Sequence, residues 1–277
     1  GDPVEFFNRT YLTEGLKDLL TRAIRRLALD NTGSSVVNLQ TNFGGGKTHS
    51  LLALYHLFGN EPVSGLSADV QNLVAGLGAS WQPGRVHRAA VVGNFLNAGK
   101  ASEKYDGTQV HTIWGELAWQ LGGHEAYDMI ADNDRNGKPP ADLLIPLLRQ
   151  YSPCLILIDE WVAYAKQLVG RDDLPAGTFD DQFVFAQSLT EAVSAVPNCM
   201  LVISIPASET GEQASDVEVG GENGQHALTA LQNVVRRKAD QWRPSTPDES
   251  FEILRKRLFE EPDAEAQEQI ALTARRF

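Results

Sequence analysis

One stretch of the chain, residues 36–57, constrains its fold more than any other. It begins with a short apolar run, Val36–Leu39, and continues through the glycine-rich segment Thr41–Thr48, which reads TNFGGGKT. An apolar run with helical spacing follows at Leu51–Leu57. A strand, a glycine-rich turn and a helix in direct succession are typical of α/β folds, in which the helix packs back on the sheet that holds the strand.

The glycine-rich segment has the composition of a phosphate-binding loop, or P-loop. Its three successive glycines let backbone N–H groups turn toward an anion that side chains would block. A helix that starts near Lys47 adds the positive end of its dipole. We expect Lys47 to contact the β- and γ-phosphates during catalysis and the Thr48 hydroxyl to ligate Mg²⁺. Thr41 occupies a position where the P-loop pattern has glycine, so an ordinary glycine turn before a helix is the alternative. The residues assigned to nucleotide binding are Phe43, Gly44, Gly45, Gly46, Lys47, Thr48 and His49.

A second apolar run ends in two adjacent carboxylates. Residues Cys154–Ile158 are continuously apolar, as expected of a strand that is covered on both faces. Asp159 and Glu160 follow directly, where open α/β sheets hold their ligands. We predict that Asp159 holds Mg²⁺, directly or through water, and that Glu160 orients and deprotonates the attacking water. Two solvated acids at a strand end are the alternative.

The remaining pattern alternates strands with helices, which predicts a parallel sheet with helices on both faces. The fold class is therefore α/β, a three-layer P-loop NTPase sandwich. Ser204 and Ser208 lie at the end of the fourth strand, where a polar side chain could sense the γ-phosphate; ordinary strand-end hydrogen bonding is the alternative. The further predicted strands are 89–92, 200–205 and 239–243, and the further helices are 16–27, 69–77, 109–121, 142–150, 161–169, 183–195, 225–238 and 245–258.

The composition narrows the function classes. A net charge of −12 argues against a surface that grips nucleic acid by charge alone. No apolar run is long enough to cross a bilayer and no secretory signal is visible, so we expect a cytoplasmic protein without membrane contact.

The two cysteines, Cys154 and Cys199, lie beside apolar runs, which indicates reduced, buried thiols; a redox pair is the alternative. Residues 132–137 imitate the start of a calcium loop, but Leu143 stands where that loop needs glutamate, so we expect a polar turn.

With a glycine loop, a strand that ends in Asp-Glu and a further strand after it, the chain resembles additional-strand P-loop ATPases of the AAA+ type. The resemblance implies ATP as the nucleotide, and a central strand 36–39 that one other strand separates from the Asp-Glu strand. It also implies that Arg236 or Arg237 is an arginine finger for a neighbouring subunit; a solvated basic helix end is the alternative. It implies that the N-terminal segment, around Phe7 and Tyr11, binds the adenine base of the nucleotide. The implied domains are an N-terminal linker and helix (1–35), an ATPase core (36–244) and the start of a truncated helical lid (245–277).

Three segments carry a closer resemblance: TNFGGGKTH at 41–49, TIWGE at 112–116 and IDEWVAYA at 158–165. They resemble large bacterial ATPases of phage-defence islands, such as the PglY-like proteins of phage growth limitation and BREX-type systems, long catalogued as a domain of unknown function. The resemblance implies a role in antiviral defence, with other subunits or defence-system proteins as partners and nucleic acid only through the full-length protein. Glu116 could support the carboxylate pair; packing of its helix on the sheet is the alternative.

These patterns predict an Mg²⁺-dependent ATPase module that works as the motor or switch of a longer protein, because both ends of the chain look like cuts. The alternative is a nucleotide-gated scaffold that binds ATP with little hydrolysis. A kinase or GTPase is less favoured, since no Asn-Lys-x-Asp segment that reads guanine is present.

Overall fold

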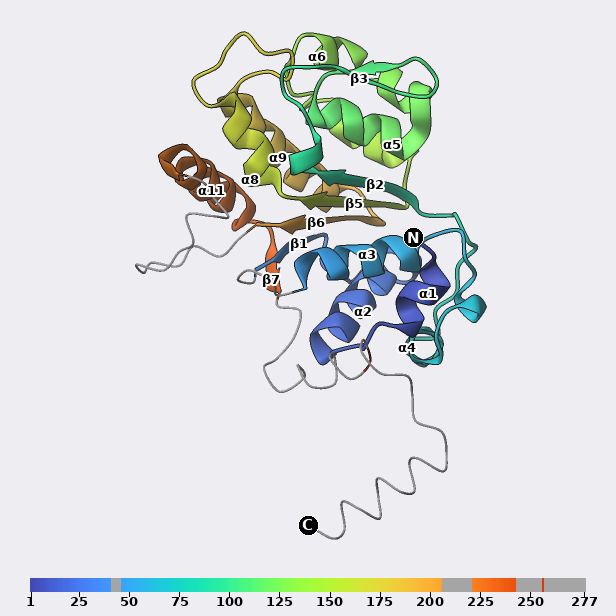
Figure 1. The fold of residues 1–277 in the computed structure, drawn as a ribbon. Helices are drawn as coiled ribbons and strands as arrows, with labels where there is room; N and C mark the ends of the chain where they lie inside the picture. Colours follow the sequence, from blue (N-terminus) through green and yellow to red (C-terminus); the bar gives the residue numbers. More distant parts are fainter. Residues whose placement is uncertain (41–45, 206–220, 243–255, 257–277) are drawn as a thin grey trace, which may run out of the picture.

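Five parallel strands form the central sheet of the computed structural model, which describes residues 1–40, 46–205, 221–242 and Lys256. The strand order is β2-β5-β6-β1-β7 (Figure 1). The strands are β1 (Val36–Leu39), β2 (His87–Val92), β5 (Cys154–Asp159), β6 (Cys199–Ser204) and β7 (Asp240–Trp242). The α/β fold class is confirmed, and the architecture is compatible with a P-loop NTPase-like three-layer sandwich. The predicted order is confirmed as well, because β6 alone separates β1 from β5.

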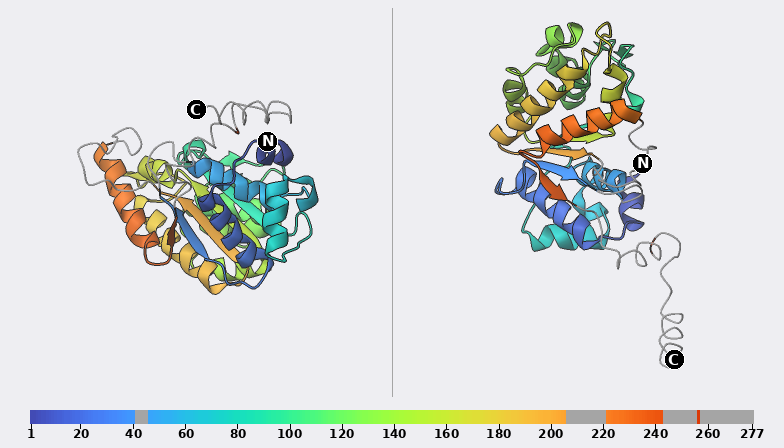
Figure 2. Two further views of the ribbon diagram at one scale, coloured as in Figure 1. Left: turned by 90° about the horizontal axis from the view of Figure 1, so that it is seen from below. Right: turned by 90° about the vertical axis from the view of Figure 1, so that its left-hand side faces the viewer.

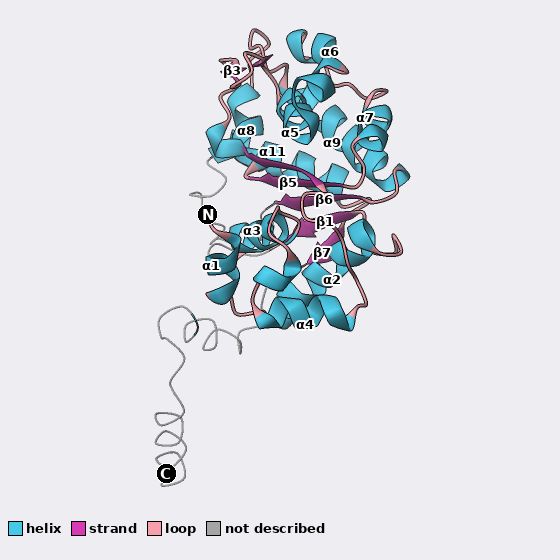
Figure 3. Ribbon diagram, turned by 90° about the vertical axis from the view of Figure 1, so that its right-hand side faces the viewer, coloured by secondary structure: helices cyan, strands magenta, loops and turns pink. Residues whose placement is uncertain are grey.

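Helices cover both faces of this sheet, as the side views show (Figure 2, Figure 3). One face carries α1 (Pro3–Asn8), α2 (Glu14–Ala28), α3 (Lys47–Leu57) and α4 (Ala68–Gly76). The opposite face carries α5 (Ile113–Asp128), α7 (Leu144–Gln150), α8 (Trp161–Ala165), α9 (Phe179–Ala195) and α11 (Gly221–Val235). The shorter elements are α6 (Ala131–Arg135), the 3₁₀ turns η1 (Val63–Gly65), η2 (Gly93–Phe95) and η3 (Lys166–Leu168), and a small hairpin of β3 (Ser102–Glu103) and β4 (Gln109–Val110).

The core consists of two apolar layers that the sheet separates. Every residue of β5 and β6 is buried, as their continuous apolar runs predict. β2 is buried only at alternate positions, because it lies at an edge of the sheet. Helices α1 and α2 share one core layer with α3, so the N-terminal helices pack on the same face of the sheet as the helix that begins at Lys47.

Helix α2 forms as its sequence predicts. The Thr13 hydroxyl oxygen caps it by accepting a hydrogen bond from the Leu16 N–H (3.0 Å). The expected apolar stripe is buried against the sheet and consists of Leu16, Leu19, Leu20, Ile24 and Leu27.

Several local predictions were wrong. No helix was predicted before residue 16, but the N-terminal segment contains α1. The Asp2 carboxylate caps the start of α1 by accepting a hydrogen bond from the Val4 N–H (2.7 Å). The helix expected from residue 109 begins at Ile113, because Gln109–Val110 instead form β4 and pair with β3, a hairpin that no pattern predicted. The polar turn expected at 132–137 is the short helix α6.

Other predicted features fall outside the described residues, namely most of the glycine loop, Ser208 and the helical lid. No helix in the described part of the chain is both long enough and apolar enough to cross a bilayer.

Candidate functional site

The structure brings the Gly-Lys-Thr sequence and the Asp-Glu pair together at the carboxyl edge of the sheet. The Thr48 hydroxyl donates a hydrogen bond to Asp159 Oδ2 (2.8 Å), although the two residues are 111 positions apart in the chain. Asp159 ends β5 and is only 4% exposed, whereas Thr48 lies exposed in the first turn of α3. Along β5, Leu155 and Leu157 face the core layer beneath α3, so strand alternation turns Asp159 toward the same helix.

Backbone conformation at the start of α3 is set by Gly46. It adopts a left-handed conformation (φ 78°), which a residue with a Cβ rarely takes, and it directly precedes Lys47. Its carbonyl oxygen accepts hydrogen bonds from both the N–H and the hydroxyl of Ser50 (2.9 Å each). Helix α3 therefore begins directly after a sharp turn. The N–H groups in the first turn of an α-helix have no partner within the helix, and such groups bind anions at helix starts. Phe43, Gly44 and Gly45 lie outside the described residues.

Glu160 also has a left-handed backbone (φ 56°), which is uncommon for a residue other than glycine. The Glu160 N–H donates to Asp159 Oδ1 (3.1 Å), so one carboxylate holds both this turn and Thr48. Gly93, at the end of β2, packs against the turn so closely that an added Cβ would lie 2.0 Å from the Glu160 carbonyl oxygen. Backbone strain at a polar site is a common mark of function.

Ser204 reaches the same edge of the sheet. It ends β6 in register with Leu39 of β1, and it is 2% exposed. Val202 faces the core layer beneath α3, so alternation turns Ser204 to the face that Asp159 occupies. Its role as a phosphate sensor stays a prediction.

Arg236 and Arg237 do not reach this edge within their own chain. They are exposed, follow the end of α11 and precede β7, whose first residue Asp240 pairs with Val37 of β1. Because β7 and β1 are parallel, the arginines lie toward the amino edge of the sheet, opposite Thr48 and Asp159.

His49 lies beside α1. Its Nε2 is 3.1 Å from the Thr10 hydroxyl, and its ring stacks on Phe6 with centroids 4.7 Å apart. Phe6 also contacts His56 (4.9 Å between ring centroids). A cavity of about 510 Å³ opens here, between α1 and the start of α3, and its wall includes Phe6, Thr10, His49, Leu52 and His56.

Phe7, which was expected near the adenine base, is fully buried in the core layer, whereas its neighbour Phe6 lines the cavity. Base binding itself stays a prediction. Burial, reinforced by the charge of Arg88, lowers the pKa of His56, so its ring is neutral at pH 7. The Asp2-Pro3 helix start is the sequence signal that could have located α1 and thus Phe6.

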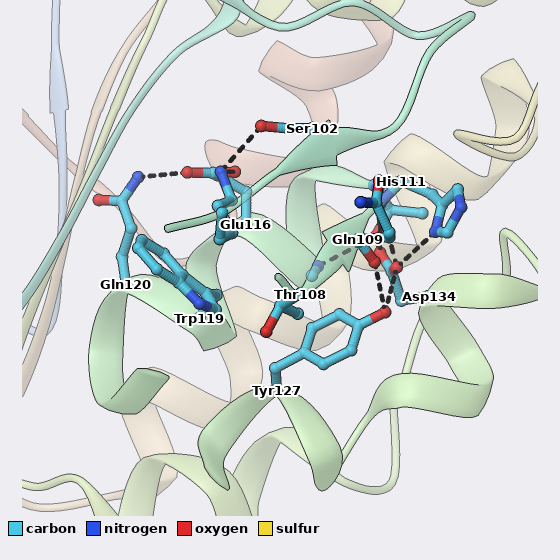
Figure 4. A network of polar contacts seen from close by, with 12 residues as sticks. Ser102, Thr108, Gln109, His111, Glu116, Trp119, Gln120, Tyr127 and Asp134 are labelled. Atoms are coloured by element: carbon cyan, nitrogen blue, oxygen red, sulfur yellow. Dashed lines mark hydrogen bonds and ion pairs between the residues drawn. The ribbon is translucent and has the colours of Figure 1, made fainter. Parts of the chain in front are cut away.

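A polar network lies in the segment that follows β2 (Figure 4). The fully buried Asp134 accepts hydrogen bonds from His111, from Thr112 and from the Tyr127 hydroxyl (2.9 Å). Burial and this last bond raise the pKa of Tyr127. The network fastens the β3–β4 hairpin to α5 and α6, which is a structural task, and no local sequence pattern predicted it.

Glu116 belongs to this region. It accepts hydrogen bonds from Lys104 Nζ and from Gln120 Nε2 (2.8 Å) (Figure 4). Among the described residues, the hydrogen-bond partners of Glu116 are thus Lys104 and Gln120, and not Asp159 or Glu160. This favours a structural role of Glu116 in its helix over support of the carboxylate pair. Glu116 also lines a second cavity of about 400 Å³ between the hairpin and α8.

The donor set at the carboxyl edge suits magnesium. A hydroxyl and a carboxylate are hard oxygen ligands, and Mg²⁺ is commonly held by one or two such groups together with phosphate oxygens and water. The described residues contain no group of three or more His, Cys, Asp or Glu side chains that could hold a metal ion.

The fold and the Thr48–Asp159 pair define an α/β protein with a polar site at the carboxyl ends of its strands, compatible with the P-loop NTPase architecture. The chain belongs to the DUF499 family: the sequence profile described as the DUF499 N-terminal domain matches residues 1–241. A search of curated proteins finds no match.

Proposed function

We propose that this domain binds ATP with Mg²⁺ at the carboxyl edge of the sheet and hydrolyses it, as the switch of a larger bacterial antiviral defence protein. The observation that carries the proposal is the Thr48–Asp159 hydrogen bond, because it joins the two segments that an ATPase needs at one point. The left-handed turns at Gly46 and Glu160 support it, since they shape the backbone on both sides of that point.

Each residue has a distinct task in this proposal. The amides at the start of α3 and the Lys47 ammonium bind the phosphates, and Thr48 and Asp159 hold the metal, which supplies charge neutralisation when bound. Glu160 orients a water molecule toward the γ-phosphate and accepts its proton. The adenine of ATP lies in the cavity between α1 and α3, whose wall includes the aromatic ring of Phe6 and the imidazole of His49.

Two substitutions test the proposal. Glu160→Gln should retain ATP binding and lower the hydrolysis rate about 100-fold or more, because it removes the carboxylate that accepts the proton of water and keeps the shape of the side chain. Lys47→Ala should weaken ATP binding roughly tenfold or more by removing a charge-assisted phosphate contact. Binding is measured by calorimetry and turnover by phosphate release on the same samples.

Matched controls are available on the surface. Glu125→Gln changes an exposed side chain on α5 and Lys17→Ala a partly exposed one on α2, and both should leave the two measurements unchanged. Unchanged turnover in Glu160→Gln, or wild-type binding in Lys47→Ala, would contradict the assignment.

A nucleotide-gated scaffold is the second candidate, and the position of Arg236 and Arg237 favours it for an isolated chain. Because they lie toward the opposite edge from their own Thr48, they could only complete the site of a neighbouring subunit. Turnover per molecule that rises with protein concentration supports the ATPase. Tight binding with no turnover at any concentration supports the scaffold.

A further inference from the structure

The two cysteines of the chain, 45 positions apart, lie side by side at the amino edge of the sheet. Cys154 opens β5, Cys199 opens β6, and the two residues are paired in the parallel register. Their Sγ atoms are 3.2 Å apart, and both side chains are fully buried as free thiols. They are the only cysteines in the sequence, so any pairing within one chain must join these two.

The surroundings of the pair distinguish its two sulfurs. The Cys154 thiol donates a hydrogen bond to Cys199 Sγ, which lowers the pKa of Cys199, while that bond and burial raise the pKa of Cys154. The buried guanidinium of Arg26 adds positive charge beside both sulfurs, and its Nε donates to the Cys199 carbonyl oxygen (2.7 Å). Cationic surroundings of this kind favour thiolate, the form in which cysteine reacts.

The backbone geometry also fits a cross-link. Paired residues on neighbouring strands are separated by about 4.8 Å, which falls within the range of roughly 4.4 to 6.8 Å between the Cα atoms of disulfides. The sulfurs are already in contact, so bond formation needs an approach of about 1 Å.

We propose that Cys154 and Cys199 are an oxidation site, at which a peroxide converts the two thiols into a reversible disulfide within one chain. The Cys199 thiolate attacks a peroxide oxygen, the O–O bond breaks, and a sulfenic acid and one water form after protonation of the leaving oxygen. Cys154 sulfur then attacks the sulfenic sulfur, the S–S bond forms, and the departing hydroxyl takes the Cys154 proton and leaves as a second water. The two sulfurs lose two electrons in total, which the peroxide accepts.

The consequence is a covalent link between the two central strands β5 and β6. It lies at the opposite end of β5 from Asp159, so the proposal is independent of nucleotide binding. Hydrogen peroxide is close to water in size and can reach the buried pair during local opening of the strand ends.

The test uses the intact chain, first reduced and then freed of reductant. It is treated with excess hydrogen peroxide under native conditions, denatured, alkylated and weighed by mass spectrometry. We expect both thiols to disappear together, with a mass loss of about 2 Da before alkylation and recovery of both thiols with dithiothreitol. The melting temperature should rise by several degrees, because the link closes a long loop in the unfolded chain.

Two variants control the assignment. Cys154→Ser should leave Cys199 to gain one or two oxygen atoms instead of losing hydrogen, because it has no resolving thiol. Cys199→Ser should slow the loss of the remaining thiol, since Cys154 lacks the stabilised thiolate. Two free thiols after peroxide treatment, a disulfide between two chains, or an oxygenated Cys199 without a cross-link in the wild type would each overturn the proposal.

Discussion

The two edges of the central sheet are built from the same strands and differ in almost every other respect. At the carboxyl edge, Glu160 holds a left-handed backbone, Gly93 tolerates no side chain, and Thr48 lies exposed beside the buried Asp159. At the amino edge, Arg26 is 7% exposed, and its guanidinium donates hydrogen bonds to four backbone carbonyl oxygens, those of Asn31, Val193, Val196 and Cys199.

Further hydrogen bonds close the amino edge. The Asn198 N–H donates to Asn31 Oδ1 (2.8 Å), the Ser152 hydroxyl donates to the Pro197 carbonyl oxygen (2.8 Å), and the Cys154 N–H donates to the Asn198 carbonyl oxygen (3.0 Å). These polar groups at the amino edge are paired within the protein. Asn31 and Asn198 there also have left-handed backbones (φ 61° and 55°), a conformation that asparagine adopts more readily than the glutamate at position 160 of the carboxyl edge. The difference indicates that stability is concentrated at the amino edge, while the proposed function assigns the ligand to the carboxyl edge.

The largest expected effect on stability comes from removing the Arg26 hydrogen bonds at the amino edge. Arg26→Ala should lower the free energy of unfolding by about 3 kcal/mol or more, because it leaves three buried carbonyl oxygens without a donor. Urea unfolding followed by circular dichroism measures the change. Arg171→Ala, which removes an exposed arginine paired with Asp173, is the matched control and should leave stability unchanged. A small loss in Arg26→Ala would mean that water satisfies this edge and that the two edges are alike.

An intermediate effect on stability is expected at Gly93 of the carboxyl edge, where there is no room for a side chain. Gly93→Ala should cost about 1–3 kcal/mol, because its Cβ forces the Glu160 turn to move. Under the proposed function, hydrolysis should fall more than ATP affinity, since Glu160 acts on water and does not bind the nucleotide. Gly76→Ala is the control: nothing lies within 4 Å of its added Cβ in α4, so we expect roughly 0.5–1 kcal/mol of stabilisation. Equal effects of the two substitutions would show that the Glu160 turn is not braced by β2.

The smallest effect concerns a carboxylate that has a structural task. Asp181 forms a capping box with Thr178 at the start of α9 and pairs with Lys138 (3.1 Å). Although burial acts in the opposite direction, the hydrogen bonds from Thr178 and Lys138 lower the pKa of Asp181. Asp181→Asn should therefore cost about 1 kcal/mol at pH 7.

The pH dependence of this effect has a definite sign. A lowered folded-state pKa means that the ionised Asp181 stabilises the fold above its unfolded pKa of about 3.9, and that the contribution is lost as pH falls through the folded value. The difference between wild type and Asp181→Asn should thus shrink on acidification below that range, as urea titrations at several pH values would measure. A difference that stays constant down to the lowest pH would contradict this account. Asp142→Asn, which changes an exposed carboxylate just before α7, is the control and should show little difference at any pH.

Features that depend on residues close together in the sequence could be predicted, and features that depend on residues far apart in the sequence could not. Local patterns located β1, β5 and β6, the start of α3 and the Asp159–Glu160 pair, because a buried strand and a capped helix each depend on neighbouring residues. The pairing of Cys154 with Cys199 and the Asp134 network could not be read from the sequence, since both depend on the register and packing of distant segments. The strand order was expected only from a family resemblance.

The position of β1 in the sheet has a consequence during synthesis on the ribosome. Its partners β6 and β7 lie about 160 and 200 residues later in the chain, so both of its hydrogen-bonding edges stay open while those residues are made. At about 5–20 residues per second, this interval lasts on the order of 10 to 30 seconds. The apolar Val36–Leu39 segment is therefore a natural target for chaperones that shield nascent chains, and translation speed between β1 and β6 should influence the yield of folded protein.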